Sequence, residues 1–395
     1  MSADFLIVGG GVVGLRIAIE LKQRYPDCGV VLIEKEDSLG FHASGRNSGV
    51  LHAGFYYSAD SLKARFCREG NAFMRAYCEE YGLKINACGK LVVAKDESEL
   101  AGLDELYRRG TINGVVLQPI TAEEARAIEP RVKTFERALF SPTTATIDPA
   151  EMMSAFEREA ERLGVLIRTG TRYLGRKGDT VQTNKGAIQA GFVVNSAGLY
   201  ADVVARDYGF SEKYTVLPFK GLYLYSSEPK GSLRTNIYPV PDLKNPFLGV
   251  HFTVTVDGKA KIGPTAIPAF WREHYTGLER FSAAEFKEVV SLEASLFLKA
   301  GFDFRGLAQA EIKKYSRPYL VNLASTLAEG IRESDYTHWG KPGIRAQLLD
   351  IEKRTLVMDF LIENDEKSLH LLNTVSPGWT CSMPFAQYVC DKIAG

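Results

Sequence analysis

Residues 4–34 read DFLIVGGGVVGLRIAIELKQRYPDCGVVLIE, and this stretch decides the fold. An apolar run over residues 5–8 enters a glycine cluster, and a helical apolar pattern then continues until Tyr25 and Pro26 end it. A second apolar run, residues 29–33, ends at the acidic Glu34, about twenty positions after the last glycine. The order strand, tight turn, helix, strand and acid predicts a unit that binds a dinucleotide.

Each of the three glycines of this unit, and its acidic residue, has a physical role. Gly9 allows a sharp turn out of the strand, Gly11 lets backbone amides approach a pyrophosphate, and Gly14 lets the helix lie close to the sheet. The helix that follows directs its positive end and its unpaired N–H groups at the phosphates. Glu34 is expected to accept hydrogen bonds from ribose hydroxyls.

Composition places the chain among ordinary globular proteins and excludes some partners. Its 395 residues suffice for two domains and a large core. Lys plus Arg and Asp plus Glu both number 48, so no excess charge attracts nucleic acid. The six cysteines form no CxxC pair, which is typical of reduced thiols in a cytosolic protein.

The first strand begins within a few residues of Met1, so we expect no signal or transit peptide. No apolar run reaches the eighteen or so residues that a membrane span needs. We therefore expect a cytoplasmic protein.

Further elements follow from periodicity and end signals. Residues 41–57, FHASGRNSGVLHAGFYY, lack periodicity and are expected to form a loop that wraps a ligand. Helices are predicted at residues 61–81, 96–109, 119–128, 149–163, 281–298 and 383–393. Strands are predicted at residues 89–94, 137–140, 192–194 and 368–372, with short strands in 165–194 and a β-rich region in 216–265. Residues 373–382 are expected to be an irregular loop.

A second crossing from strand through glycine to helix occurs at residues 192–208, far from the first. It predicts that the chain returns to the same sheet, so the dinucleotide domain is discontinuous. We expect an α/β fold with a Rossmann-like domain from residues 1–88, 145–215 and 340–395. A β-rich α+β substrate domain is expected from residues 89–144 and 216–339.

Several segments resemble a known superfamily. GGGVVG (residues 9–14) with Glu34, VVNSAGLYAD (193–202) and LLNTVSPGWTCSMPFAQYV (371–389) resemble the FAD-dependent D-amino-acid oxidase superfamily. SGRNSGVLHAGFYY (44–57), FKGLYLY (219–225), LGVHFT (248–253) and KPGIRAQ (341–347) are similar to its L-2-hydroxyglutarate dehydrogenases and oxidases. The resemblance implies a fold of the glutathione-reductase-like type and oxidation of L-2-hydroxyglutarate to 2-oxoglutarate.

The residues themselves also favour FAD over NAD. Gly9, Gly198 and Gly378 lie in three separate loops that open helices, whereas no second GxGxxG unit is present to hold a pyridine nucleotide. The cofactor contacts expected from the motifs and the resemblance are Gly9, Gly11, Val13, Gly14, Glu34, Lys35, Ser44, Gly45, Asn47, Ser48, Gly49, Ala197, Gly198, Gly343, Pro377, Gly378, Trp379 and Thr380.

Oxidation of a 2-hydroxy acid at a flavin moves the hydroxyl proton to a base and the C2 hydride to flavin N5. A base that titrates near neutral pH is best supplied by histidine, and the candidates are His251 and His52. The sequence leaves open which of the two acts and allows a structural role for either.

The carboxylates of a dicarboxylic substrate need cationic partners. Arg345 matches the position at which the superfamily grips a carboxylate, with an ordinary ion pair as the alternative. Lys220 is expected at the second carboxylate or near flavin N5, unless it is a plain strand-edge lysine. Tyr56 and Tyr57 are expected to line the pocket, with packing as the alternative role.

Other features bear on partners and rival functions. The remaining histidines show no metal-ligand spacing, and no GxSxG motif suggests hydrolysis. Electrons are expected to pass to a membrane quinone, another acceptor or oxygen. The aromatic-rich stretch 267–304 either lies peripherally on a membrane or packs between domains. The rivals are oxidases of another hydroxy acid, an amino acid or glycerol 3-phosphate, and a non-catalytic flavoprotein that assists assembly.

Overall fold

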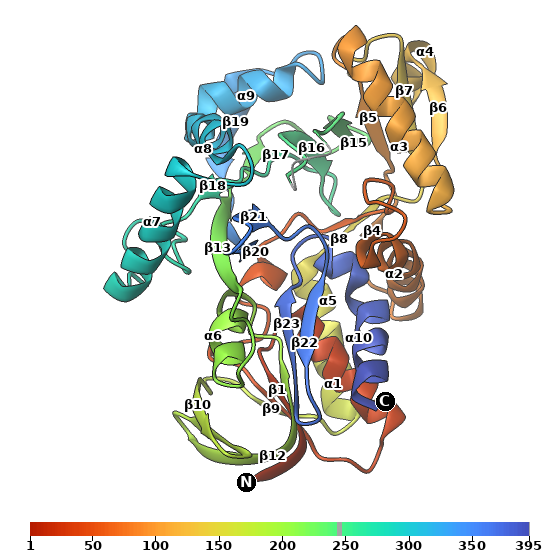
Figure 1. Ribbon diagram of the computed structural model, residues 1–395. Helices are drawn as coiled ribbons and strands as arrows, with labels where there is room; N and C mark the ends of the chain where they lie inside the picture. Colours follow the sequence, from red (N-terminus) through yellow and green to blue (C-terminus); the bar gives the residue numbers. More distant parts are fainter. Residues whose placement is uncertain (243–246, 395) are drawn as a thin grey trace.

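The computed structural model describes residues 1–242 and 247–394 (Figure 1). Its first sheet has eight strands in the order β10-β11-β12-β1-β2-β9, with β23 beside β12 and β22 beside β23. These strands are β1 (Ser2–Val8), β2 (Val30–Ile33), β9 (Leu166–Arg168), β10 (Tyr173–Lys177), β11 (Thr180–Thr183), β12 (Gly186–Asn195), β22 (Leu361–Asn364) and β23 (Ser368–Asn373). β1 pairs in parallel with both β2 and β12, so the second crossing does return to the first sheet, as predicted.

Four helices pack around this sheet, and three of them lie side by side in the lower half of Figure 1. They are α1 (Val12–Arg24), α2 (Leu62–Glu80), α5 (Pro149–Arg162) and α10 (Gly378–Ala394). Apolar side chains from all four form the largest core, in which Leu15, Phe66, Phe156 and Phe385 are fully buried. Both chain ends lie in this half of the molecule.

A second sheet of eight strands fills the upper half of Figure 1. Its order is β19-β14-β17-β16-β15-β5-β7-β6. The strands are β5 (Lys90–Val93), β6 (Gln118–Thr121), β7 (Arg137–Ser141), β14 (Leu224–Ser226), β15 (Asn236–Pro239), β16 (His251–Val254), β17 (Ala260–Gly263) and β19 (Tyr336–Trp339). Helices α3 (Leu100–Ile112) and α4 (Ala122–Ile128) lie at one end, and α7 (Ala283–Leu298), α8 (Phe304–Ile312) and α9 (Arg317–Ser325) at the other.

Two small sheets join the halves. β13 (Tyr214–Gly221) pairs antiparallel with β20 (Gly343–Asp350) over their whole length, flanked by β18 (Ile267–Pro268) and β21 (Thr355–Leu356). The other sheet contains β3 (Val50–Leu51), β4 (Ile85–Asn86) and β8 (Ala145–Ile147). β13 runs across the boundary predicted at residues 215/216. The division into two domains stays a prediction.

Local end signals explain why several helices begin where the sequence predicts. Ser61 caps α2 by accepting from Ala64 N–H, and Thr121 with Glu124 forms a capping box on α4. Asp148 accepts from two amides of α5, which has a proline at its first position.

The last helix differs from its prediction. α10 begins at Gly378, inside the segment expected to be a loop, and it contains Pro384. The helix continues through this proline because Cys381 and Phe385 are buried against α1 and α2. At Gly70 of α2, a Cβ would lie 1.9 Å from the carbonyl oxygen of Thr380, so the two helices touch through their backbones. Tertiary packing therefore outweighs the tendency of glycine and proline to interrupt this helix.

Two smaller differences occur at element boundaries. α3 continues to Ile112 instead of ending at residue 109, and residues 118–121 form β6 before α4 begins. The third glycine loop leads through a short 3-10 turn, Gly198–Tyr200, into α6 (Ala201–Arg206).

Candidate active site

One cavity of about 930 Å³ runs from the glycine turn after β1 to the second sheet. Its lining comes from the ends of β1, β2, β12 and β23, from the loop over residues 42–52, and from β16 and β20. The carboxyl ends of parallel strands therefore meet the β-rich half of the protein around one space. The volume lies at the upper end of the range for small-molecule sites, about 300–1,000 Å³.

The glycine turn brings backbone atoms against the cavity. Gly9 has φ +112°, and a Cβ there would lie 2.4 Å from the carbonyl oxygen of Ser196. A Cβ on Gly14 would lie 2.2 Å from the carbonyl oxygen of Gly9, so α1 lies against the turn without a side chain between them. α1 begins without a side-chain cap from Gly11, and its first amide, Val12 N–H, donates to Ser44 Oγ at 2.9 Å. The start of α1 thus presents amides to the cavity.

Glu34 lies at the end of β2, as expected for a ribose contact. Its carboxylate accepts from Gly10 N–H at 2.8 Å and from Glu36 N–H at 2.9 Å, so its orientation is fixed from two sides. Burial raises the pKa of Glu34. Each carboxylate oxygen has a further lone pair to accept from a hydroxyl of a bound nucleotide.

Two other chain segments bring backbone amides to the same cavity. Gly198 has φ +56° at the turn after β12, and α10 begins at Gly378. The wrapping loop is tied to α10, because Trp379 Nε1–H donates to Ser44 O at 2.8 Å and His52 N–H donates to Thr380 Oγ1 at 3.0 Å. Backbone amides at three turns or helix N-termini therefore surround one cavity. This arrangement suits a cofactor that carries a pyrophosphate in its middle and a ring system at its end.

The two histidines predicted as bases lie together at the other end of the cavity. His251 starts β16 and His52 follows β3, and both are buried. His251 Nδ1 lies 2.9 Å from the carbonyl oxygen of Gly249. Because a carbonyl only accepts, Nδ1 carries the proton and Nε2 retains a lone pair.

Both imidazoles are neutral at pH 7. Burial, with a smaller contribution from the charge of Lys90, lowers the pKa of His52 to about 3. Burial also lowers the pKa of His251 well below its ordinary value, and the charges of His52, Lys90 and Arg345 act in the same direction. Each ring is therefore in the form that accepts a proton at pH 7, but its pKa lies below the near-neutral value expected from the sequence because the ring is buried.

Arg345 on β20 lines the cavity near these histidines. Its Nη1–H donates to the carbonyl oxygen of Thr265 at 2.9 Å, and its guanidinium lies 5.5 Å from the ring centre of Phe247. Among residues 1–242 and 247–394, no ion pair joins Arg345 to a carboxylate. Burial lowers the pKa of Arg345, and Tyr223 and Glu311 oppose this shift. Glu311 itself pairs with Lys314, and a guanidinium stays charged, so Arg345 can bind an anionic ligand.

Five residues named from the sequence do not line the cavity: Gly45, Gly49, Tyr56, Tyr57 and Lys220. β13 pairs Phe219 with Arg345 and Lys220 with Ile344, so Lys220 and Arg345 point to opposite faces of their small sheet. Burial lowers the pKa of Lys220 to about 8, and the residue that its charge affects is His274.

The other four residues support the cavity from behind. A Cβ on Gly45 would lie 2.5 Å from Gly40 O, and one on Gly49 would lie 2.4 Å from Ile147 O, so both glycines serve close packing of the loop. Tyr57 packs against the main core. Tyr56 is buried in the cluster that contains Phe55 and Tyr238. Tyr56 and Tyr57 were expected to line the pocket, but both pack behind the residues that line it.

Sequence reasoning missed several residues that line the cavity, among them Tyr223, Tyr238, Phe247 and Glu311. Burial raises the pKa of Tyr223 to about 12, and the nearby charge of Arg345 opposes this shift. The ring of Tyr238 stacks on His251 with 3.7 Å between ring centres. The alternation of Gly221 and Tyr223 on one face was the available signal for Tyr223. No signal in the sequence indicated Tyr238 or Glu311, because only the tertiary fold brings β15 and α8 to the cavity.

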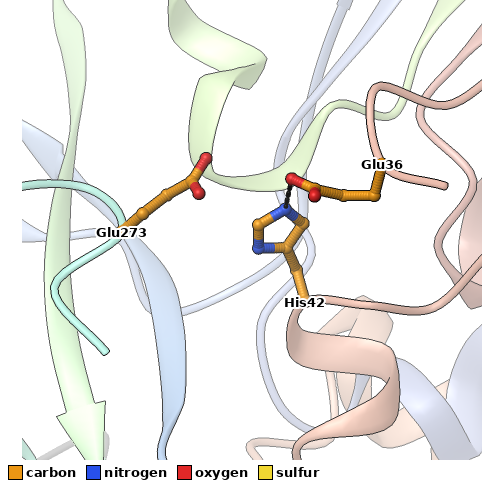
Figure 2. A group of neighbouring side chains, drawn as sticks. All are labelled: Glu36, His42 and Glu273. Carbon is orange, nitrogen blue, oxygen red and sulfur yellow. Dashed lines mark hydrogen bonds and ion pairs between the residues drawn. The ribbon is translucent and has the colours of Figure 1, made fainter. Parts of the chain in front are cut away.

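A charged cluster lies at the nucleotide end of the cavity, where Figure 2 shows Glu36, His42 and Glu273 converging. Their nearest ligand atoms lie within 4.8 Å of one another. Arg280 donates to both oxygens of Glu36, at 2.6 and 2.8 Å, and Lys35 pairs with both carboxylates. Two cations already balance the two carboxylates, so we assign no metal to this cluster.

The sheet, the glycine turns and the buried histidines and arginine around one cavity are typical of a dinucleotide-dependent oxidoreductase. Residues 4–392 match the model of the FAD dependent oxidoreductase family, DAO. The chain belongs to this family. FAD is accordingly its cofactor, and the residues at the nucleotide end of the cavity fit it.

Curated relatives and solved structures agree with this family. The chain is 31% identical over 396 residues to "L-2-hydroxyglutarate dehydrogenase" of Escherichia coli K12, covering 99% of this chain and 93% of the relative. It is 34% identical over 418 residues to the mitochondrial L-2-hydroxyglutarate dehydrogenase of Homo sapiens, covering 99% and 89%.

Among solved structures, the L-alpha-glycerophosphate oxidase of Mycoplasma pneumoniae with FAD bound has a TM-score of 0.80 at 22% identity, covering 100% of this chain and 95% of that chain. The glycine oxidase of Geobacillus kaustophilus has a TM-score of 0.73 at 22% identity, covering 100% and 95%. At these identities the two structures support the fold alone.

Proposed function

We propose that this protein oxidises L-2-hydroxyglutarate to 2-oxoglutarate with FAD as its resident cofactor. The observation that carries the proposal is the single cavity that joins the glycine turn and Glu34 to the pair His52 and His251 and to Arg345. The relatives named L-2-hydroxyglutarate dehydrogenase, which align with nearly the whole chain, support this choice of substrate.

The chain's own residues divide the work between binding and proton transfer. When bound, FAD supplies the acceptor for the hydride that leaves C2 of the substrate. Arg345 binds a substrate carboxylate through its two-pronged guanidinium and so fixes the orientation of C2. A neutral imidazole, with Nε2 of His251 as the first candidate, takes the hydroxyl proton. Burial of both histidines excludes bulk water from this proton transfer.

Anaerobic mixing tests the substrate. The yellow holoprotein is mixed with L-2-hydroxyglutarate, D-2-hydroxyglutarate, lactate, glycerol 3-phosphate, glycine and proline, and flavin absorbance is followed. We expect fast bleaching with L-2-hydroxyglutarate alone. Bleaching by another compound assigns a different oxidase activity, and no bleaching by any compound leaves the non-catalytic flavoprotein as the function.

Substitution of the histidines tests the base. We expect His251→Gln, or failing that His52→Gln, to slow flavin reduction by about 10²–10⁴-fold while FAD stays bound. Stopped-flow absorbance measures the rate, and the visible spectrum after gel filtration measures retained FAD. Near-normal reduction in both variants would remove the imidazoles from the mechanism.

We further propose that the electron acceptor is a membrane quinone and that the protein reaches it peripherally. The support is a group of exposed apolar side chains around α7, in which Leu278 and Leu298 are 78% and 77% exposed. Phe281, Phe286 and Phe297 are also exposed there. No helix among the described residues is long and apolar enough to cross a bilayer, so contact by these side chains would be interfacial.

Vesicle sedimentation tests this contact. Holoprotein is centrifuged with vesicles of neutral and of anionic phospholipid, and we expect Leu278→Glu with Leu298→Glu to reduce the bound fraction at least severalfold. Leu174→Glu with Leu166→Glu is the control, because these leucines are exposed far from α7, on β10 and β9. Equal sedimentation of the two double variants would contradict membrane contact through α7.

A further inference from the structure

Lys90 is a fully buried lysine without a conventional partner. It begins β5 in the second sheet, and its exposed fraction is 0%. In the part of the chain that the structure describes, its Nζ has no hydrogen-bond partner and no ion pair. Buried ammonium groups usually pair with carboxylates, because desolvation of an unpaired charge is costly. Lys90 therefore needs a specific explanation.

Three aromatic rings enclose this ammonium group. Nζ lies 4.6 Å from the ring centres of both Phe55 and Tyr56 and 4.7 Å from that of Tyr238. All three distances are within the range of cation–π attraction, which is strongest where water is excluded. The rings come from the wrapping loop and from β15, so Lys90 holds together two segments that are far apart in the sequence.

The enclosure extends directly to the base of the proposed reaction. The ring of Tyr238 is stacked on His251 with 18° between the ring planes, so the same ring contacts both the imidazole and the ammonium group. His52 lies in the same region, four residues from Tyr56, with Nδ1 buried and without a hydrogen-bond partner among the described residues. Lys90 itself does not line the cavity.

We propose that Lys90 is a positioning residue for the imidazole pair: its caged ammonium group holds the Tyr238 ring against His251 and places a positive charge behind both histidines. The inference rests on the proposed function, in which one of these imidazoles is the base. A hydrophobic residue of similar length would fill the same space without the cost of a buried charge. The groups on which this charge acts are the two histidines.

The charge makes a specific pH dependence. The groups that act on His251 are His52, Lys90 and Arg345, and the group that acts on His52 is Lys90. Burial lowers the pKa of Lys90 itself to about 7. Below pH 7 the ammonium form disfavours protonation of the imidazoles and so preserves the base. Above about pH 8 Lys90 is neutral, and its effect on them ends.

The test uses the holoprotein with Lys90→Met and Lys90→Arg. Lys261→Met is the matched control. Lys261 is also buried in the second sheet, on β17, and its Nζ lies 4.6 Å from the ring centre of Tyr223. Its charge is not among those that act on His52 or His251. Flavin reduction by L-2-hydroxyglutarate is measured in rapid pH jumps from pH 3 to 9, because the pKa of His52 is about 3 and that of His251 is also lowered. Selectively labelled histidine reports the imidazole pKa values by NMR, with His52→Gln and His251→Gln used to assign the signals.

In Lys90→Met we expect the acid limb of the rate profile and the imidazole pKa to rise by about one unit, the size that one charge produces in a partly screened interior. At pH values below the imidazole pKa of both the wild type and the variant, the variant should reduce flavin about tenfold more slowly than the wild type. Near pH 9 its rate should approach the wild-type rate. Lys90→Arg should keep the wild-type acid limb, and Lys261→Met should not shift it. Thermal stability of Lys90→Met should change little, because the loss of the cation–π contacts is offset by removal of an unpaired buried charge.

The outcomes separate this inference from the proposed function. If Lys90→Met lowers the rate equally at every pH, or leaves both the profile and the NMR titrations unchanged, the inference is wrong while the histidine mechanism stands. If both His→Gln variants reduce flavin at normal rates, the proposed base is wrong. In that case the NMR titration still decides whether Lys90 acts on the imidazoles.

Discussion

At the scale of single residues, the cavity is distinguished by a buried guanidinium, that of Arg345, which forms no ion pair with a carboxylate among residues 1–242 and 247–394. Elsewhere, buried arginines have carboxylate partners: Arg16 pairs with Glu159 at 3.0 Å, and Arg272 pairs with Asp202 at 2.7 Å. Arg345 instead contacts a carbonyl oxygen and an aromatic ring. A site that leaves a guanidinium in this state gains most from an anionic ligand, as the proposed dicarboxylate requires.

Replacement of Arg345 by Met should therefore weaken substrate binding. We expect KM for L-2-hydroxyglutarate to rise about 10- to 100-fold, because one charge-assisted, hydrogen-bonded pair with the substrate is lost. Arg345→Lys keeps the positive charge, so its KM should rise less. Steady-state kinetics with an artificial acceptor measures KM. Arg137→Met is the control, because Arg137 pairs with Asp104 on the surface. An unchanged KM in Arg345→Met would place the carboxylate elsewhere.

At the scale of elements, the nucleotide half was predictable because its signals are local. α1, α2 and α5 begin at or next to the residues predicted from the sequence, and Glu34 lies where its distance from Gly14 placed it. α10 was misplaced at its start because its proline and glycine act locally, whereas the burial that forms it comes from α1 and α2.

The substrate end was less predictable for a related reason. Lys90, Tyr238 and Arg345 come from three strands in two different sheets, and no spacing in the sequence encodes their proximity. Likewise, the face on which Lys220 points depends on a strand register that the sequence does not specify. The residue types were recognisable, but their neighbours were not.

The close contact of α1 with the turn after β1 leads to a prediction for this element. In Gly14→Ala, the new Cβ would meet Gly9 O at 2.2 Å, so α1 must shift away from the sheet. We expect a loss of about 1–3 kcal/mol of stability and much weaker FAD binding. Calorimetry and FAD titration of the apoprotein measure the two effects.

Gly29→Ala is the matched control within the same unit, since a Cβ there would meet nothing closer than 3.5 Å. It should retain FAD and unfold near the wild-type temperature. Equal behaviour of the two variants would mean that the turn yields to a side chain and does not fix the position of α1.

At the scale of the whole molecule, charged contacts join the nucleotide half to the chain before α7. Glu36 and His42 follow β2, whereas Glu273 and Arg280 precede α7. The contact of Arg280 with Glu36 spans 244 positions in the sequence, and Tyr200 donates hydrogen bonds to Glu273 and Glu285 at 3.0 Å. Because these residues line the nucleotide end of the cavity, the cluster couples the junction of the halves to cofactor retention.

This junction should weaken as pH falls. Hydrogen bonds from Arg280 lower the pKa of Glu36, so the carboxylate stabilises the fold above its ordinary pKa, about 4.3, and this stability is lost as pH falls through the folded value. Burial, followed by the charge of Lys35, lowers the pKa of His42 to about 4. Protonation of this histidine therefore favours the unfolded chain once pH drops below about 6.5. Both effects act in the same direction.

We therefore expect Arg280→Gln to lower stability at pH 7 by about 1 kcal/mol, a modest value because Arg280 is 39% exposed and partly screened by solvent. The difference from the wild type should stay constant down to about pH 4.5 and shrink below it, because the Glu36 carboxyl then takes up a proton in the unfolded chain while it stays paired with Arg280 in the folded protein. Thermal unfolding and the rate of FAD release, followed by flavin fluorescence from pH 3 to 7, measure it. Arg108→Gln, which breaks an exposed pair with Glu105, should change neither. A difference that stays constant with pH would show that Arg280 contributes packing and not charge.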